Sequence, residues 1–420
     1  MGSLKVIKGG TLIDGTGAGP VRDSVVVIEG SKITEVGSSN RVRIPGGAEV
    51  IEAGGRVVMP GLIDCHTHIS NFRTPYPATG WGTLEVGVSD RAVKAVVAAK
   101  NLLEAGITTI RDCGSAGHID IAVRDAIKRG EIIGPRVLGS DAGLSITGGH
   151  GDSVKTVRVL AFEGGKEEAK RHGIVDGVTE CIRAVREMVR VGADWIKIWA
   201  TGGVMEAEEK AGNWEFSDEE IKAIVKEATK CGRSVAAHAV GPTDAIKFCA
   251  EVGIKSIEHG IFCDQETIDV MKEKGTFLVP TMIAYELLTK DMFPATTREV
   301  AKRAVATHEQ TLKMAKKAGV KIAMGTDSGS PYGNVHGKCQ LWELELMATR
   351  GLTPMEAIVA STKTAAECIG IGGKTGTIEP GKLADLLIVQ GSPLEDIKIL
   401  QDQSRIKMVM REGAPYVTRP

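Results

Sequence analysis

The chain has 420 residues, of which 42 % are hydrophobic and 25 % charged, and its formal net charge is only −1. This length exceeds what one ordinary core fills, so it predicts one large barrel domain with an addition, or two domains. The near-neutral charge argues against a nucleic-acid partner, and the absence of both a long apolar run and a signal-peptide pattern predicts a soluble, cytoplasmic protein with no membrane partner.

The eight cysteines are scattered along the chain without CxxC pairs. This spacing fits reduced thiols in a cytoplasm better than a disulfide framework or a zinc knuckle. We therefore expect most of them to be small core residues.

Both ends of the chain are rich in short β-type runs. Residues 1–56 include "SVVVIEGSKITEVG", and residues 377–420 include "KLADLLIVQG" and "RIKMVMREG". Val- and Ile-rich runs punctuated by Gly and Ser are typical of strands. Two β-rich ends around a different middle predict one small β domain made from both termini.

The middle of the chain, residues 57–376, alternates apolar runs with amphipathic helical stretches. Helices are predicted at 217–232 and 353–370, where Ser217 and Thr353 provide N-caps. Eight strands are predicted: "VVMPGLIDCHTH", "TTIRDCG", "RVLGSDAG", "WIKIWAT", "SVAAHAV", "SIEHG", "FLVPTMIAY" and "KIAMGTDS". This alternation predicts a (β/α)8 barrel of the α/β class, with a doubly wound open sheet as the structural alternative.

Four connections from a strand to the next helix are long and carry Gly, Pro and polar residues. They span residues 71–88, 144–176, 202–216 and 328–340. Loops longer than about 12 to 15 residues without structure of their own are usually functional or disordered. In a barrel these loops would form the walls and lid of the pocket, and we expect residues 71–88 and 144–176 to determine specificity.

Two histidines lie one residue apart at the end of the first predicted strand, in "DCHTH". Residues two apart on a strand point the same way, so His66 and His68 can converge on one point. Two imidazoles aimed at one point suit a metal ion. Taken alone, the pair fits ordinary polar residues at a strand end equally well.

Four further polar residues lie in or at the ends of other predicted strands. Lys197 has apolar neighbours, and a buried ammonium is costly unless it is paired or chemically altered. Either its head reaches water, or the neutral amine takes up CO2 and becomes a carbamate that bridges metal ions. The fifth, sixth and eighth strands end in His238, His259 and Asp327. Such a set on five separate strands is hard to assign to packing.

The ordered set "HTH", "IKI", "AAHAV", "IEHG" and "GTDSG", with "GGTLIDGTG" and "GTIEPGKLADLLIV" near the two ends, resembles the metal-dependent amidohydrolase superfamily. The likeness is greatest to the imidazolonepropionase-like branch that includes Xaa-Pro dipeptidases. It covers essentially the whole chain. The resemblance implies a (β/α)8 barrel over residues 57–376, with a β-sandwich formed by residues 1–56 and 377–420.

The resemblance also implies two divalent metal ions, usually zinc. Carried over by position, His66, His68 and Asp327 hold the more buried ion, His238 and His259 hold the more exposed ion, and carboxylated Lys197 bridges the two. The expected reaction is hydrolysis of an amide C–N bond by a hydroxide that bridges the ions.

Further residues are predicted to act on the substrate. Asp327 is the candidate general base and later general acid. His150, in the glycine-rich "SITGGHGDS", is the candidate donor to the carbonyl oxygen as it gains charge. Tyr285 and His336 are candidates for lining the substrate pocket.

The expected substrate is a small amide or peptide that releases an amino acid, such as a dipeptide, an N-acyl amino acid or an arylamide. Val240 departs from the dipeptidase-like pattern, which usually has an aromatic there, and "TAAECIG" replaces the common "NPA" of the last barrel helix. A cyclic amide, carbamate or urea-type hydrolase is the alternative, since fold and metal do not choose the substrate. A non-catalytic assembly protein of the same fold is the alternative from another class. A homo-oligomer is expected.

The remaining histidines and two tryptophans complete the predictions. His118, His172 and His308 have no companion ligands and are predicted to be surface or packing residues. Trp195 and Trp199 face the same side of their strand as Lys197. Such crowding predicts either a local irregularity or a wide pocket.

Overall fold

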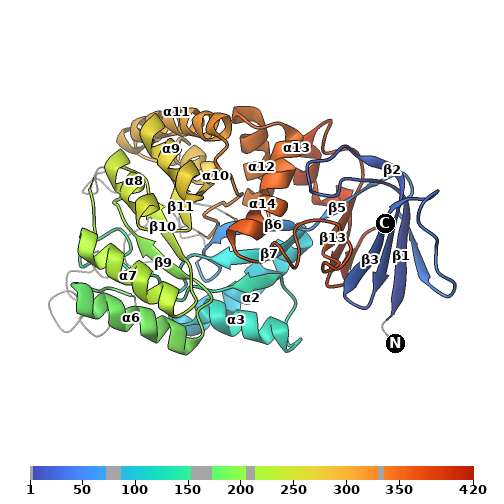
Figure 1. The fold of residues 1–420 in the computed structure, drawn as a ribbon, viewed down its shortest axis with the longest axis horizontal. Helices are drawn as coiled ribbons and strands as arrows, with labels where there is room; N and C mark the ends of the chain where they lie inside the picture. The colour runs from blue at the N-terminus through green and yellow to red at the C-terminus, as the bar shows by residue number, and fades with distance from the viewer. Residues whose placement is uncertain (1–2, 72–86, 153–172, 205–212, 330–334) are drawn as a thin grey trace.

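The computed structural model describes residues 3–71, 87–152, 173–204, 213–329 and 335–420. Its strands form two assemblies, a large sheet at one end of the molecule and a group of parallel strands surrounded by helices (Figure 1). Both chain ends lie at the large sheet (Figure 1).

The end sheet has eight strands that come from both ends of the chain. They are β1 (Leu4–Leu12), β2 (Val21–Glu29), β3 (Lys32–Ser38), β4 (Glu49–Glu52), β5 (Val57–Pro60), β13 (Leu386–Val389), β14 (Ile406–Arg411) and β15 (Ala414–Thr418). Their order is β15-β14-β13-β5-β1-β2-β3, and β4 pairs with β1. Because β5 pairs with both β1 and β13, it joins the N-terminal strands to the C-terminal ones. Apolar side chains such as Ile7, Val26 and Ile388 form the core on one face.

Eight segments make up the second assembly, and we call them the strand ring. Seven are regular strands: β6 (Leu62–Thr67), β7 (Ile107–Asp112), β8 (Arg136–Leu138), β9 (Ile196–Trp199), β10 (Val235–Ala239), β11 (Ser256–His259) and β12 (Phe277–Val279). They pair in parallel as β6-β7-β8 and β9-β10-β11-β12. Parallel strands bring their carboxyl ends to the same side.

Irregular backbone joins these two sheets at both of their edges. The eighth predicted strand, residues 321–328, is not a regular strand, but it forms parallel bridges from Ile322 to Leu278 in β12 and from Ser328 to Thr67 in β6. At the other edge, a parallel bridge from Leu144 to Ile198 connects the segment after β8 with β9. Every neighbouring pair in the strand ring is therefore linked by backbone hydrogen bonds.

Helices cover the strand ring. They are α2 (Val88–Glu104), α3 (Ile119–Lys128), α6 (Val178–Val191), α7 (Asp218–Lys230), α8 (Thr243–Glu251), α9 (Gln265–Lys274), α10 (Met282–Leu288), α11 (Ala295–Ala318), α12 (Cys339–Arg350), α13 (Pro354–Ala360) and α14 (Lys363–Cys368), with short 3-10 turns at Ile397–Gln401 and Gln403–Arg405. The predicted capping box of α7 is present, with Ser217 and Glu220 each satisfying the other's backbone N–H. Among the described helices, none combines the length and the apolar character that crossing a membrane requires.

The seventh predicted strand, residues 277–285, is wrong in its second half. The strand ends at Val279, and α10 begins at Met282. Proline has no N–H to continue the ladder, so Pro280 ends the pairing. The carboxylate of Glu343 then accepts hydrogen bonds from the backbone N–H groups of Met282 (2.9 Å) and Ile283 (2.7 Å), which starts the helix.

The helix predicted over residues 353–370 is two helices, α13 and α14. The carbonyl of Ala360 accepts a hydrogen bond from Met324, and that of Ser361 accepts one from Ile63 in β6. These carbonyls cannot also continue a helical ladder. The break therefore attaches the last helices to the strand ring.

The first predicted strand, residues 57–68, is also divided, into β5 of the end sheet and β6 of the strand ring. Gly61 separates them, and a Cβ there would lie 2.3 Å from the side chain of Thr108. Only glycine allows this close approach. All eight cysteines are free, and seven are buried, as the spacing predicted.

Candidate metal centre

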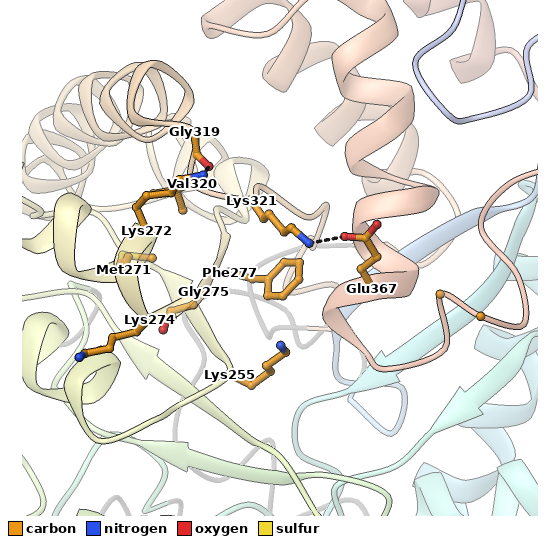
Figure 2. A pocket seen from close by; sticks show the side chains of 13 residues that line it. Lys255, Met271, Lys272, Lys274, Gly275, Phe277, Gly319, Val320, Lys321 and Glu367 are labelled. Atoms are coloured by element: carbon orange, nitrogen blue, oxygen red, sulfur yellow. Dashed lines mark hydrogen bonds and ion pairs between the residues drawn. The ribbon is translucent and has the colours of Figure 1, made fainter.

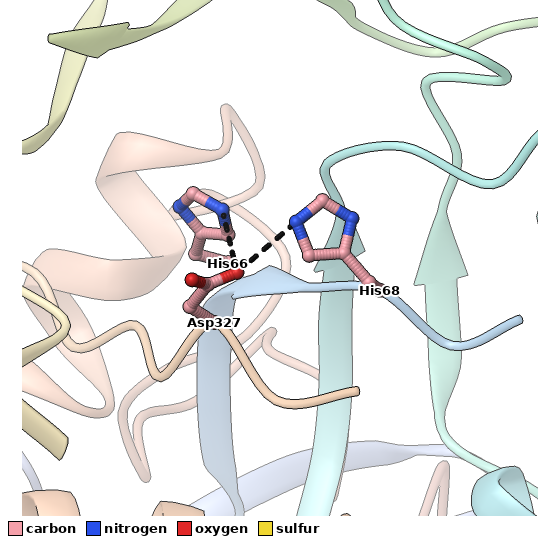
Figure 3. A group of neighbouring side chains, drawn as sticks. All are labelled: His66, His68 and Asp327. Atoms are coloured by element: carbon pink, nitrogen blue, oxygen red, sulfur yellow. Dashed lines mark ion pairs between the residues drawn. The ribbon is translucent and has the colours of Figure 1, made fainter. Parts of the chain in front are cut away.

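Polar side chains meet at the carboxyl ends of the strand ring. His66 lies in β6, His68 follows that strand, and Asp327 lies near the end of the 321–328 segment. Nε2 of His68 is 3.1 Å from Oδ1 of Asp327, and Nε2 of His66 is 3.5 Å from the same oxygen. Figure 3 shows both imidazoles directed at this carboxylate. One ligand atom from each residue lies within 4.8 Å of the others, which is close enough to hold a metal ion.

The other three predicted ligands lie beside this group. Nζ of Lys197 is 3.4 Å from Nε2 of His66, and its side chain is buried. The His259 ring centroid is 5.2 Å from that of His66 and 4.4 Å from that of His238. All six predicted ligand residues are thus brought together.

The buried ring nitrogen Nε2 of His238 has no hydrogen-bond partner in the described structure. A buried polar atom without a partner is costly unless a ligand completes it. Imidazole nitrogens and a carboxylate suit zinc and several other divalent ions. The donor set therefore fits the metal ions that the sequence predicts.

Burial and the neighbouring charges set the charge states of these groups. Burial, assisted by the charge of Lys197, lowers the pKa of His66 and of His259, and burial with the nearby His150 lowers the pKa of His238. Burial alone would raise the pKa of Asp327, but the hydrogen bond to His68 and the nearby cations hold it below its ordinary value. The imidazoles of His66, His238 and His259 thus keep lone pairs for a cation, and the aspartate is a carboxylate. The pKa of His68 is raised instead, because its hydrogen bond to Asp327 and the charge of that carboxylate outweigh burial, so a metal ion would have to displace a proton from this ring.

Three of the histidines have a partner at Nδ1. His68 donates to the carbonyl of Gly114 (2.9 Å), His66 meets Glu258 (2.8 Å), and His259 meets Oγ1 of Thr281 (2.6 Å). A partner at Nδ1 fixes the ring and leaves Nε2 for a metal ion. The sequence analysis did not identify Glu258 and Thr281 as contacts of the predicted ligands, because neither lies in a spacing that marks a ligand.

Left-handed backbone marks the same place. His259 (φ 72°), Thr281 (φ 53°) and Asp327 (φ 56°) all have positive φ angles. This conformation is unfavourable for residues with a side chain and persists where the surrounding structure enforces it, often at functional sites. The fold therefore keeps these three residues in an unfavourable backbone conformation, and their side chains lie at the predicted metal site.

Besides Asp327, three residues are predicted to act on the substrate, and their surroundings differ. The His150 ring stacks on that of His238 (4.4 Å), and its backbone N–H donates to Glu215 (2.6 Å). The Tyr285 ring lies 5.6 Å from that of His259. His336 is buried, and its Nδ1 lies 2.9 Å from Oγ of Ser328. His150 and Tyr285 therefore contact the predicted ligands, whereas His336 contacts Ser328 in the segment that carries Asp327.

The two tryptophans near Lys197, Trp195 and Trp199, pack against different neighbours. The Arg111 guanidinium lies 4.7 Å from the Trp195 ring centroid, beneath the predicted ligands. Trp199 lies against Gly143 and Gly151, where an added Cβ would come within 2.6 and 2.5 Å of its indole. The predicted crowding is relieved by glycines. Among the remaining histidines, His308 is buried, His118 is exposed and paired with Asp141, and His172 lies outside the described residues.

A cavity of about 610 Å³ lies at the opposite, amino ends of the strands. Lysines surround it, as Figure 2 shows, but three are already engaged: Lys272 donates to the carbonyl of Gly319 (2.8 Å), Lys321 pairs with Glu367 (2.6 Å), and Lys274 pairs with Glu273 (2.8 Å). Gly275 and Gly319 end α9 and α11 there. Cations are favourable at helix C-termini, so these lysines have a structural explanation. None of the predicted ligands lines this cavity.

Comparisons with known proteins agree with this geometry. Residues 57–415 match the amidohydrolase family. The chain is 34 % identical to an ochratoxinase of Aspergillus niger over 98 % of this chain and 86 % of that protein, and 26 % identical to an imidazolonepropionase of Rhizobium rhizogenes over 89 % and 88 %. It superposes on the crystal structure of a Xaa-Pro dipeptidase with bound methionine in the active site with a TM-score of 0.89 and 34 % identity, over 99 % of this chain and 100 % of that one.

Proposed function

Because the chain belongs to the amidohydrolase family, we propose that it is a metal-dependent hydrolase that cleaves an amide C–N bond and releases an amino acid. The observation that carries the proposal is the convergence of His66, His68 and Asp327, with their ligand atoms within 4.8 Å of one another and Lys197 beside them. Such a group at the carboxyl ends of parallel strands lies where barrel enzymes have their active sites.

We assign two divalent metal ions to this group. His66, His68 and Asp327 would hold the first, His238 and His259 the second, and Lys197, as a carbamate, would contact both. When bound, two such ions lower the pKa of a water molecule and polarise a carbonyl. The buried, unpartnered Nε2 of His238 and the lowered pKa values of His66, His238 and His259 support this assignment.

Proton transfer falls to Asp327. Its side chain is 17 % exposed, whereas that of His66 is 1 % exposed, so Asp327 is accessible from the open side of the site. As a carboxylate it can accept a proton from the attacking water and deliver it to the leaving amine. His150, on the face of His238, is the proposed donor to the carbonyl oxygen as it becomes negative.

The fold proposal follows the same lines. We assign a (β/α)8 barrel to residues 61–376 and a β-sandwich to residues 1–60 together with 377–420. The predicted boundary at residue 57 moves past β5, because that strand pairs with β1 and β13 in the end sheet. The continuous hydrogen bonding of the strand ring and the mixed origin of the end sheet support this division.

The substrate proposal is a dipeptide, an N-acyl amino acid or an arylamide. The similar Xaa-Pro dipeptidase holds methionine in its active site, and the similar Aspergillus niger protein is an ochratoxinase. The dipeptidase name and its bound methionine favour an enzyme that accepts an amino acid on the leaving side.

Metal analysis together with a substrate panel tests the proposal. Purified protein is assayed for metal content and for release of an amino acid from N-acylmethionine, Xaa-Met and Xaa-Pro dipeptides, ochratoxin and arylamides, before and after chelation. Nearly two ions per chain and chelator-sensitive release of an amine are expected. Turnover of only cyclic amides, carbamates or ureas would replace the substrate class, and no metal and no turnover would favour a non-catalytic assembly protein.

A further inference from the structure

A buried ion pair lies next to His66 of the candidate metal centre. Nη2 of Arg111, in β7, lies 2.6 Å from Oε1 of Glu258, in β11, and both side chains are 0 % exposed. The guanidinium also donates to Oγ of Ser256 (2.9 Å) and to the carbonyl of Cys65 (2.6 Å). The hydroxyl of Ser256 in turn donates to Oε1 of Glu258 (2.5 Å). One carboxylate oxygen is therefore fully engaged by two donors.

The second carboxylate oxygen of Glu258 contacts a predicted ligand. Oε2 lies 2.8 Å from Nδ1 of His66, whose side chain is 1 % exposed. A carboxylate paired with a guanidinium only accepts hydrogen bonds, so the proton of the His66 ring must be on Nδ1. The lone pair is then on Nε2, the nitrogen that faces Asp327 and Lys197.

We propose that Glu258, held by Arg111 and Ser256, is a positioning residue that fixes His66 in the ring orientation and tautomer needed to bind the first metal ion. This inference rests on the proposed function. A buried ion pair is weak evidence for a gain in stability. Positioning His66 would give the Arg111–Glu258 pair a role other than packing.

A metal ion between His66, Glu258 and Cys113 is the competing explanation for this cluster, because one ligand atom of each lies within 4.8 Å of the others. Two facts argue against it. Arg111 already occupies Glu258, and a cation beside a guanidinium is unfavourable. Burial also raises the pKa of the Cys113 thiol to about 12, whereas metals bind the thiolate.

The variant Glu258→Gln discriminates sharply between positioning and packing. Its amide has one accepting and one donating end. Arg111 only donates, so the amide oxygen must face Arg111 and the NH2 group must face Nδ1 of His66. Nδ1 then has to accept, which moves the ring proton to Nε2 and removes the lone pair that binds the metal.

A second variant, Arg111→Met/Glu258→Gln, removes the constraint. Without the guanidinium the amide can turn, so that its oxygen accepts from Nδ1 of His66 again and its NH2 group faces Ser256. Positioning therefore predicts that the double variant binds metal more tightly than Glu258→Gln. If the pair served packing alone, losing a second buried group would give no such recovery.

A matched control exists at a distance from the metal centre. Asp385 is 1 % exposed and pairs with Arg136 (2.9 Å), and it also accepts a hydrogen bond from Thr375 (2.7 Å). Asp385→Asn breaks a buried carboxylate–guanidinium pair of the same kind. It is expected to lower stability while leaving zinc affinity unchanged.

The experiment measures Zn²⁺ affinity by competition with a chromophoric chelator, on folded protein confirmed by circular dichroism. Glu258→Gln is expected to bind the tighter ion about 10- to 100-fold more weakly, with partial recovery in the double variant. Wild-type affinity in Glu258→Gln, or no recovery in the double variant, overturns the inference while the proposed function stands. A wild-type chain that binds no metal overturns the proposed function first and this inference with it.

A measurement on the unaltered chain keeps the inference testable if the variants do not fold. In metal-free protein labelled with ¹⁵N-histidine, the His66 signals are identified by their loss in His66→Gln. A proton on Nδ1 and a bare Nε2 are expected from the ¹⁵N shifts. The opposite tautomer would overturn the inference.

Discussion

Nζ of Lys197 lies 3.4 Å from Nε2 of His66, although both side chains are about 1 % exposed. A neutral imidazole nitrogen can accept one long hydrogen bond from a buried ammonium, but it does not neutralise the charge of that cation. Conversion of the amine to a carbamate would replace this cation with a carboxylate next to two metal positions. Removal of this buried positive charge is the physical reason for assigning Lys197 as the bridge between the metal ions.

Lys197→Ala is expected to abolish turnover, by at least about 100-fold, because a metal bridge would be lost. Short carboxylic acids such as formate or acetate should restore part of the activity by occupying the vacated space. The measurement is kcat with and without added acid, beside metal content. Full activity in the variant would exclude the bridging role, and Lys255→Ala, at the amino end of β11, is the control for loss of a lysine.

Asp327→Asn is expected to eliminate turnover, because an amide cannot accept the proton of the attacking water. The side chain keeps its size, so circular dichroism should stay near that of the wild type, and the melting temperatures are compared after chelation because Asp327 is also a proposed metal ligand. A variant that retained normal kcat would remove Asp327 as the proton carrier.

Thr281→Val tests the orientation of His259. The change removes the hydroxyl that lies 2.6 Å from Nδ1 of that ring while conserving its volume. We expect about a 10-fold loss of affinity for the second metal ion. Thr311→Val is the matched control, because its buried hydroxyl also makes a hydrogen bond, to the carbonyl of Ile261, away from the ligands. Equal metal affinities in both variants would contradict the prediction.

His308 is expected to make stability depend on pH. Burial lowers its pKa to about 4, and neither ring nitrogen has a described hydrogen-bond partner. The unfolded chain takes up a proton near pH 6.5 and the folded chain does not, so stability is lost as pH falls from about 6.5 towards 4. The loss between pH 7 and pH 5 should be about 2 kcal/mol.

His308→Leu should reduce that loss, since it removes the group that titrates only in the unfolded state. The check is the free energy of unfolding by urea at pH 7 and pH 5 for both chains. An unchanged difference between the two pH values would assign the acid sensitivity to other groups.

Metal removal is expected to lower thermal stability. An ion that binds only the folded chain stabilises it by about 4 kcal/mol at a thousand times its dissociation constant. Differential scanning calorimetry before chelation, after it, and after Zn²⁺ is restored measures the effect. A melting temperature that ignored chelation would argue against tightly held ions.

The pattern of the sequence predicted seven of the eight ring segments as strands that form, with wrong bounds at the first and the seventh, and it supplied the six ligand candidates. Parallel strands share one direction, so a polar residue at the end of each run lies on the same side, and His66, Lys197 and His259 could be placed together before any coordinates. The sequence also predicted the start of α7 correctly, since Ser217 and Glu220 form the expected capping box.

Prediction failed where a distant partner overrides the local pattern. Tyr285 reads as part of a strand, but it lies in a helix because Glu343, 58 residues further along the chain, holds the backbone N–H groups at the start of α10. The division of the last predicted helix likewise depends on β6, because the backbone N–H of Ile63 donates a hydrogen bond to the carbonyl of Ser361.

The sequence by itself determined which residue types stand at the strand ends, because the two-residue periodicity of a strand and the caps of a helix are local properties of the chain. Only the tertiary structure decided which atom of each residue faces the centre. Arg111 holds Glu258, and Glu258 and Thr281 contact Nδ1 of His66 and of His259 from other parts of the fold. Such choices depend on contacts across the fold, which no spacing along the chain records.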